Sequence, residues 1–533
     1  MKKFCPTYYV SIAGLTGLLF FSCQSMQEPI DQPSYYAPWQ SLGVLFEDVQ
    51  MAGIFPDSKT FVDCTPKDKP ELILQAYLSA REKEGFVLRS FVEEYFDLPP
   101  TSDLTTYQSE RSLNEHLHAH WDYLTRSSQR PSAFTTLIPL PEKYVVPGGR
   151  FREIYYWDSY FTMIGLGVSG RLDLFESMLD NFAFLLDTIG FIPNGNRSYY
   201  LGRSQPPYFS AMVNAYMRLT LDENGLTYLP MIQKEYDFWM DGQDKVNEAS
   251  PSYRRVVYLN GTILNRYWDD LDFPRPEAYK PDRELAEGLD DATKKRLYRN
   301  LRAAAESGWD FSTRWFADVT DFSSIRTTDI APIDLNCLIY NMELTLSNLY
   351  RLAGDQEQAL RFLKLAETRY NAINLLFWNA EAGMYQDIMW KNGDFTGQIT
   401  AAGFYPLYFK AARSDYARAQ VPVLFDTLLK DGGLSTSVMA SGQQWDMPNG
   451  WAPLQWIAIK GLEHYGLEEE ADDVRTRWLR VNQKVFVNTG KMMEKYNVVD
   501  TTLLAGGGEY PTQDGFGWSN GVVLGLLSGD VKY

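Results

Sequence analysis

Apolar side chains recur at every third or fourth position through much of the chain, the spacing that places them on one face of a helix. The clearest run occupies residues 334–352 and ends just before Gly354, a residue that commonly stops helices. Its apolar positions are Leu335, Leu338, Ile339, Met342, Leu346 and Leu349. The same spacing resumes at once over residues 359–373. This region therefore predicts two helices joined by a short turn.

Comparable helix pairs are predicted near residues 172–188, 207–241, 398–430 and 451–486, between irregular stretches rich in aromatic residues, Gly and Pro. Few segments alternate cleanly between apolar and polar residues as strands do. The pattern predicts an α-rich protein whose antiparallel helix pairs stack into a bundle, a solenoid or a closed toroid. No repeat of fixed period and no Ser/Gly/Pro-rich linker interrupts residues 40–533, which favours one domain.

The first residues have the pattern of an export signal. Lys2 and Lys3 precede an uncharged stretch whose most apolar part, residues 10–21, is too short to span a bilayer. The stretch ends in Phe-Phe-Ser-Cys, which resembles a bacterial lipobox except that Phe20 stands in place of the usual Leu.

We therefore expect residues 1–22 to be removed as a lipoprotein signal peptide and Cys23 to be lipidated. Residues 23–40 would then form a polar tether between the lipid anchor and the folded domain, which would occupy residues 41–533. The anchored protein would face the periplasm. Ordinary cleavage to a soluble periplasmic protein and a retained signal anchor stay open as alternatives.

Composition narrows the class of partner. Acidic residues outnumber basic ones by 68 to 50, which argues against a surface that binds nucleic acid phosphates. Aromatic residues make up 15% of the chain, a content that suits proteins whose flat rings pack against sugars, although an aromatic-rich core would account for it equally well.

The cysteines and histidines offer no metal or disulfide framework. If the signal is removed, the remaining cysteines are Cys23, which would be lipidated, Cys64 and Cys337. A disulfide bond between Cys64 and Cys337 is possible but unsupported. His116 and His120 would share a helical face, yet no Glu completes an H-E-x-x-H zinc motif, so we interpret them as part of a structural helix. We expect neither a catalytic metal nor a cofactor.

Four stretches outside the periodic helices are dense in Trp, Gly, Arg, Asp and Glu, the residues that supply turns, apolar faces and charged hydrogen bonds together. They lie at residues 147–160, 193–205, 307–311 and 494–518. The first, Pro-Gly-Gly-Arg-Phe-Arg-Glu-Ile-Tyr-Tyr-Trp-Asp-Ser-Tyr, resembles the first signature of the trehalase family. Residues 444–453, Gln-Trp-Asp-Met-Pro-Asn-Gly-Trp-Ala-Pro, resemble the second.

The similarity extends through residues 265–270, 275–277 and 506–518, and it covers nearly the whole chain after about residue 40. The resemblance is to the periplasmic bacterial trehalases of glycoside hydrolase family 37. It implies an all-α fold, an (α/α)6 barrel with irregular active-site loops at one mouth, and hydrolysis of α,α-trehalose to two glucose molecules by an inverting mechanism.

Matching to the family implies that Asp310 is the general acid and Glu494 the general base. An inverting glycosidase needs this pair, because one carboxyl group protonates the leaving oxygen while one carboxylate activates water on the opposite face of the sugar. From spacing alone, a helix N-cap is the favoured interpretation of Asp310, and a solvated charge at a helix end is the alternative for Glu494. Only the surrounding motifs raise both to catalysts.

The same matching implies a set of substrate-binding residues. Arginines and a glutamate would hold sugar hydroxyls through charged forks, Trp157 would supply an apolar face, Gly308 would offer backbone, and Glu509 would close over the substrate from a Gly-rich loop. The full set is Arg150, Trp157, Asp158, Asn194, Arg203, Ser204, Gln205, Arg275, Pro276, Glu277, Gly308 and Glu509. Internal salt bridging is the alternative role for the charged members, and Arg152, Asp446 and Trp451 are candidates for supporting roles.

We expect a monomer that binds trehalose and touches the membrane only through its lipid anchor. Two rival functions remain at this point: an α-glucosidase with another substrate on the same barrel type, and a surface sugar-binding protein without catalysis. Assays with maltose and sucrose beside trehalose would separate the first rival. Retention of both carboxylates argues against the second.

Overall fold

The computed structural model describes residues 35–100, 111–127, 133–221, 223–503 and 512–529. Residues from Tyr35 onward form one compact unit. The expected signal peptide, Cys23 and Glu509 lie outside the described residues. None of the helices in the described part is long and apolar enough to cross a membrane.

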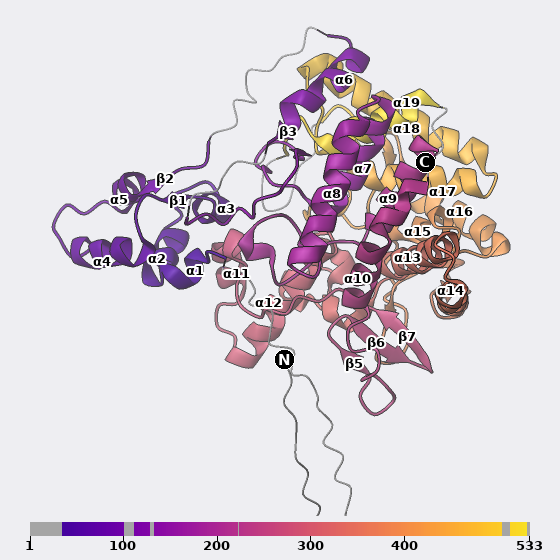
Figure 1. Cartoon of the computed structure of the whole chain (residues 1–533), viewed down its shortest axis with the longest axis horizontal. Helices are drawn as coiled ribbons and strands as arrows, with labels where there is room; N and C mark the ends of the chain where they lie inside the picture. The colour runs from indigo at the N-terminus through magenta and orange to yellow at the C-terminus, as the bar shows by residue number, and fades with distance from the viewer. Residues whose placement is uncertain (1–34, 101–110, 128–132, 222, 504–511, 530–533) are drawn as a thin grey trace, which may run out of the picture. The chain divides into compact units, whose positions relative to one another are not determined.

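The described residues are mainly helical, as the periodicity predicted, and they form 19 α-helices (Figure 1). The first six are α1 (Pro38–Ser41), α2 (Val44–Ala52), α3 (Ser58–Val62), α4 (Pro70–Ala80), α5 (Leu88–Tyr95) and α6 (Leu113–Leu124). The next six are α7 (Tyr156–Val168), α8 (Leu172–Thr188), α9 (Phe209–Thr220), α10 (Leu229–Trp239), α11 (Tyr279–Leu285) and α12 (Asp291–Glu306). The last seven are α13 (Ile333–Leu352), α14 (Gln356–Leu376), α15 (Tyr405–Tyr408), α16 (Ser414–Leu428), α17 (Ala452–His464), α18 (Glu468–Thr489) and α19 (Gly517–Ser528).

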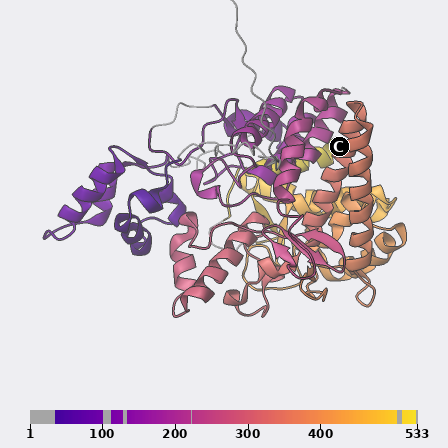
Figure 2. The same ribbon diagram turned by 60° about the horizontal axis from the view of Figure 1, so that its bottom comes forward.

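Consecutive helices pack as antiparallel pairs, most extensively α13 with α14 and α17 with α18. The apolar positions predicted for residues 334–352 are all fully buried along α13, which explains why that face turns inward. Two views show α13 and α14 running beside each other (Figures 1 and 2). The pair predicted over residues 451–486 corresponds to α17 and α18, whereas residues 172–188 form the single helix α8, so the pair predicted there is wrong.

Helices from the two ends of the main helical region also meet, because α7 packs against α19. Glycines make the contact close: a Cβ on Gly165 would lie 2.6 Å from the Cα of Gly521. Side chains at these positions would force the two helices apart. This contact brings the motif at the start of α7 next to the C-terminal motif that precedes α19.

Strands in the described residues are short and lie between the helices. The longest sheet is antiparallel and contains β5 (Ser252–Tyr253), β6 (Val256–Leu259) and β7 (Thr262–Asn265). Two further strands matter for the site, β14 (Asn449–Trp451) and β15 (Lys495–Asn497), which pair antiparallel with Trp451 opposite Lys495. The other strand pairs are β1 (Thr65–Pro66) with β2 (Phe96–Asp97), β3 (Thr125–Arg126) with β4 (Tyr144–Val145), β8 (Ile330–Ala331) with β11 (Ile388–Met389), β9 (Trp378–Asn379) with β10 (Met384–Tyr385), and β12 (Leu429–Lys430) with β13 (Gly433–Leu434).

The segment from α1 to β2, residues 38–97, forms a layer of short helices with its own small hydrophobic core. We call it the N-terminal layer. Its Phe46 packs edge-on against Tyr279 of α11, with ring centroids 5.4 Å apart. The layer also hydrogen-bonds the segment before α11, because Gln50 Nε2 donates to the carbonyl of Pro276 at 3.1 Å.

The histidine pair lies on one helix, as predicted: His116 and His120 are buried on α6 with their rings stacked at 4.9 Å. Burial lowers the pKa of each imidazole to about 4. Cys64 and Cys337 are both buried and free, so no bridge joins them.

Candidate active site

One cavity collects most of the residues that the motifs singled out. Among the expected site residues, its walls include Asp310, Glu494, Arg150, Trp157, Asp158, Asn194, Arg203, Gln205, Arg275, Glu277 and Gly308. Ser204 and Pro276 are buried beside the cavity and do not line it. Ser204 instead binds the framework, since its hydroxyl donates to the carbonyl of Ile192 at 2.6 Å.

Asp310 is placed by the way α12 ends. Gly308 follows the helix with φ of 76°, a left-handed conformation that favours glycine, and a Cβ there would lie 2.7 Å from the indole of Trp157. The next capped element, the 3-10 helix η5 (Thr313–Trp315), has Ser312 as its N-cap, so Asp310 caps no helix.

The second signature fixes the segment around Asp310 from the other side. Gln444 Nε2 donates to the main-chain carbonyl of Asp310 at 2.6 Å, and the backbone N–H of Trp445 donates to the carbonyl of Phe311 at 3.0 Å. Asp446 accepts hydrogen bonds from the hydroxyls of Ser312, Thr313, Ser437 and Ser441 and from the Thr313 amide. Asp446 therefore has the supporting role that was expected for it.

Glu494 precedes β15 and is 1% exposed, which excludes a solvated charge at a helix end. The main chain around it is anchored, because its N–H donates to the carbonyl of Gln513 at 2.9 Å and its carbonyl accepts from Trp518 Nε1 at 2.8 Å. The ammonium of Lys495 lies 3.4 Å from Glu494 Oε2 and is itself buried. This contact orients the carboxylate within the wall of the cavity.

Asp158 lies at the start of α7, close enough to Asp310 and Glu494 for their carboxyl groups to affect its pKa. Burial raises the pKa of Asp158 well above its usual range, and the charges of Glu494 and Asp310 raise it further against an opposing backbone hydrogen bond. Three carboxyl groups, those of Asp158, Asp310 and Glu494, thus converge on one cavity. The raised pKa favours the neutral form of Asp158, which can donate a hydrogen bond.

The cationic wall of the cavity is already paired with acidic residues. Arg203 donates to Glu277 at 2.6 Å and to Asn194 at 2.9 Å. Arg275 forms a two-pronged contact with Asp282. Burial alone would raise the pKa of Glu277, but the guanidinium groups around it, led by Arg203, lower it. The charged members therefore line the cavity and form internal salt bridges at the same time.

Aromatic rings form the apolar part of the wall. Trp157, Trp445, Trp451 and Trp518 all line the cavity. Trp445 stacks on Trp451 with centroids 3.9 Å apart and planes within 3°, and Trp157 leans on Trp445 at 5.6 Å. Flat faces held this rigidly suit the apolar faces of sugar rings.

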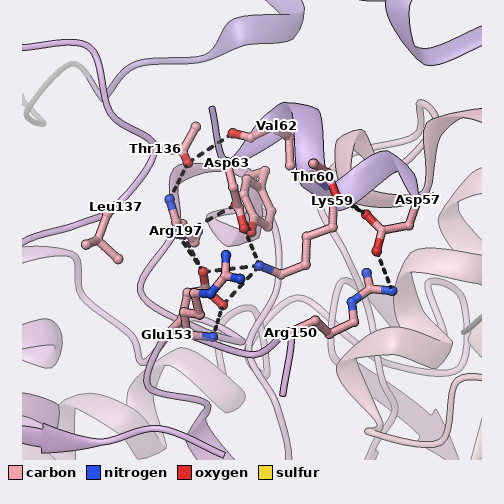
Figure 3. A network of polar contacts seen from close by, with 12 residues as sticks. Asp57, Lys59, Thr60, Val62, Asp63, Thr136, Leu137, Arg150, Glu153 and Arg197 are labelled. Carbon is pink, nitrogen blue, oxygen red and sulfur yellow. Dashed lines mark hydrogen bonds and ion pairs between the residues drawn. The ribbon is translucent and has the colours of Figure 1, made fainter. Parts of the chain in front are cut away.

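Several lining residues were not expected from the motifs. Tyr155 and Tyr200, whose hydroxyls lie 2.8 Å apart, belong to stretches that were singled out as motifs. Lys59 is different, because it comes from α3 in the N-terminal layer and carries no recognisable motif. Its ammonium meets Glu153 at 3.1 Å inside a buried network of charges (Figure 3). No signal in the local sequence distinguishes this lysine from a surface one.

Comparison with known proteins identifies the family. The trehalase family model matches residues 53–529. The periplasmic trehalase of Salmonella paratyphi B is 46% identical over 507 residues, which cover 95% of this chain and 89% of the relative.

Solved structures agree with these sequence matches. The neutral trehalase Nth1 from Saccharomyces cerevisiae superposes with a TM-score of 0.60 at 25% identity, covering 79% of this chain and 80% of that one. A mannosylglycerate hydrolase of glycoside hydrolase family 63 from Thermus thermophilus, solved with glucose, has a TM-score of 0.51 at 16% identity, over 78% of this chain and all of that one. At that identity the second match concerns the fold alone.

Proposed function

The chain belongs to the trehalase family and hydrolyses α,α-trehalose to glucose, and we propose that Asp310 and Glu494 are its general acid and general base in an inverting reaction. The observation that carries the proposal is their convergence: both carboxyl groups line one buried cavity, although their segments lie far apart in the sequence. The trehalose would occupy this cavity between the aromatic and cationic walls.

The proposed reaction uses the two groups in one displacement. Asp310 gives its proton to the oxygen that bridges the two glucose units, while Glu494 takes a proton from a water molecule. The water oxygen forms a new bond to the anomeric carbon on the face opposite the breaking C–O bond. One product therefore has the β configuration, and the leaving glucose keeps the α configuration. Glu494 then releases its proton to solvent and Asp310 takes one up, which restores both groups for the next cycle.

The remaining wall residues bind and orient the substrate in this proposal. Arg203 and Arg275 are held rigidly by acidic partners, so their guanidinium groups can meet sugar hydroxyls without first being ordered. Arg150, Asn194, Gln205 and Glu277 line the same cavity and offer further donors and acceptors. Glu509 is proposed to complete the site from the loop that the family motif contains. Asp158 lines the cavity together with the two proposed catalytic residues.

Substitution of the two carboxyl groups tests the assignment. Asp310→Asn and Glu494→Gln preserve size and remove the proton donor and the base, so each should lower kcat for trehalose by a factor of about 10³ or more. Glu343→Gln is a matched control that should keep the parental kcat, since this buried carboxylate contacts Arg369 and neither residue lines the cavity. Retention of more than a tenth of the parental kcat in either catalytic variant would contradict the assignment.

We further propose that the helix pairs close into an (α/α)6 barrel. The antiparallel packing of successive helices, the contact of α7 with α19 and the similarity to the yeast neutral trehalase support this arrangement.

We also propose an exported, monomeric lipoprotein in which Cys23 is lipidated after removal of residues 1–22. Mass spectrometry of the processed N-terminus tests this, because an unmodified Cys23 would contradict it.

A further inference from the structure

Helix α3 and its N-cap carry two charged side chains toward the catalytic cavity: Lys59 lines it, and Asp57 contacts Arg150 in its wall. Asp57 is its N-cap and accepts from the backbone N–H and the hydroxyl of Thr60, each at 2.8 Å. Lys59, in the first turn, lines the cavity although its side chain is only 4% exposed. A charge buried this deeply is costly unless it is paired, so its partners matter.

Lys59 belongs to a neutral network of four buried charges (Figure 3). Its ammonium lies 2.5 Å from Asp63 and 3.1 Å from Glu153, and Arg197 in turn lies 2.7 Å from Glu153 and 3.5 Å from Asp63. Burial would raise the pKa of Glu153, but Lys59 and Arg197 together lower it. Glu153 is thereby fixed to α3 as a carboxylate.

Asp57 makes a second connection between the N-terminal layer and the segment that contains Glu153. Its Oδ2 lies 3.2 Å from Arg150 Nη1, and Arg150 lowers the pKa of this carboxyl against the opposing effect of burial. Arg150 stands three residues before Glu153 in the first signature. The stretch that carries Arg150 is therefore held to α3 at both ends, once through the guanidinium itself and once through Glu153.

We propose that Asp57 and Lys59 are positioning residues for substrate, which set the place of Arg150 in the cavity wall. The inference rests on the proposed function, in which Arg150 binds a trehalose hydroxyl. It makes the N-terminal layer a part of the substrate site. Loss of either residue should weaken substrate binding without altering the acid and the base, so KM rises while kcat holds.

The decisive variant is Asp57→Asn in the full-length protein. Asn still caps α3, since its side-chain oxygen can accept from the Thr60 amide, but it removes the charge that holds Arg150. We expect KM for trehalose to rise about 3- to 10-fold with kcat within twofold and an unchanged Tm. Lys59→Met should raise KM at least as much, with a lower Tm because two carboxylates lose their partner. Asp48→Asn is the control, since it removes an ion pair of the same layer, with Arg81 at 3.2 Å, away from the cavity.

Two further results separate this inference from the proposed function. Arg150→Gln should raise KM by at least as much as Asp57→Asn. If Arg150→Gln raises KM while Asp57→Asn and Lys59→Met leave it unchanged, Arg150 binds substrate as proposed and the role of α3 is wrong. If Asp57→Asn raises KM and Arg150→Gln does not, the route through Arg150 is wrong. A fall in kcat with constant KM in Asp57→Asn would also overturn the inference.

Discussion

The side-chain amide of Gln444 accepts a hydrogen bond from Lys495 Nζ at 2.8 Å, and its own N–H donates to the main-chain carbonyl of Asp310 at 2.6 Å. Lys495 is next to Glu494 and contacts its carboxylate. One buried amide thus connects the backbone that bears the proposed acid to the residue that orients the proposed base. The relative placement of the two carboxyl groups depends on this connection.

Removal of the Gln444 amide should therefore lower turnover as well as stability. In Gln444→Met, the carbonyl of Asp310 and the ammonium of Lys495 lose a buried partner, at about 1–3 kcal/mol in the free energy of unfolding, and we expect kcat to fall at least tenfold. Steady-state kinetics and urea unfolding measure both. Gln420→Met is matched, because Gln420 is a buried amide bonded to two backbone groups away from the cavity. Equal kcat in the two variants would contradict the connection.

Gly308→Ala should displace Trp157 and reduce activity. The added methyl meets the Trp157 indole at 2.7 Å, and alanine is also strained at φ of 76°, so we expect more than about 2 kcal/mol of destabilisation together with a reduced kcat/KM. Gly354→Ala separates the two causes. Its φ is 84° with no atom within 4 Å, so it should cost only the backbone strain, about 1–2 kcal/mol, and leave kcat/KM unchanged. Equal effects of the two substitutions would contradict the contact with Trp157.

Glu235 should make the folded state less stable as pH rises. Burial raises the pKa of this carboxyl to about 8, and the hydroxyl of Tyr156 donates to it. Between the ordinary pKa and about 8, the folded state holds a proton that the unfolded state releases, so stability falls by up to about 1.4 kcal/mol per pH unit. Below the ordinary pKa of a glutamate, Glu235 is protonated in both states and no stability is lost.

Glu235→Gln removes this titration while keeping an acceptor for Tyr156. The variant should gain stability relative to the parent as pH rises from 5 to 8, as measured by urea unfolding at several pH values. Other buried acids contribute equally to both proteins, so the difference isolates Glu235. A difference that stays constant across this range would show that Glu235 does not titrate there.

Arg314 should be essential for stability because it joins two buried carboxylates. Its guanidinium lies 2.8 Å from Asp334 and 2.7 Å from Asp387, between the rings of Trp309 and Trp315. Arg314→Met leaves both carboxylates unpaired, which should destabilise the fold by about 3–5 kcal/mol. Arg413→Met removes an exposed pair with Asp415 and should cost less than about 1 kcal/mol. Similar midpoints in urea for these two variants would contradict the prediction.

The sequence predicted the long helices well because their apolar spacing is regular. The range 334–352 begins one residue inside α13, whereas the range 172–188, predicted as a pair, is the single helix α8. The N-terminal layer was not predicted as a separate structure, because its helices are short and their apolar faces are shared among several of them. Periodicity cannot show which short helices share a core.

The candidate site was predicted by motif more than by physical pattern. Asp310 and Glu494 had plausible structural roles from spacing alone, and only the structure shows that Asp310 caps no helix and that Glu494 is buried. Contacts between segments far apart in the sequence could not be predicted from the sequence pattern. Lys59 meets Glu153 across 94 residues, and Gln444 reaches Asp310 across 134, and neither residue type signals such a partner locally.

The most direct test of the inverting mechanism is proton NMR of trehalose hydrolysis, recorded before the glucose products mutarotate, for the parent and for Asp310→Asn and Glu494→Gln. The inverting mechanism predicts equal early amounts of α- and β-glucose from the parent and the loss of both signals in the two variants. Early release of α-glucose alone would mean retention of configuration and would contradict the roles proposed for Asp310 and Glu494.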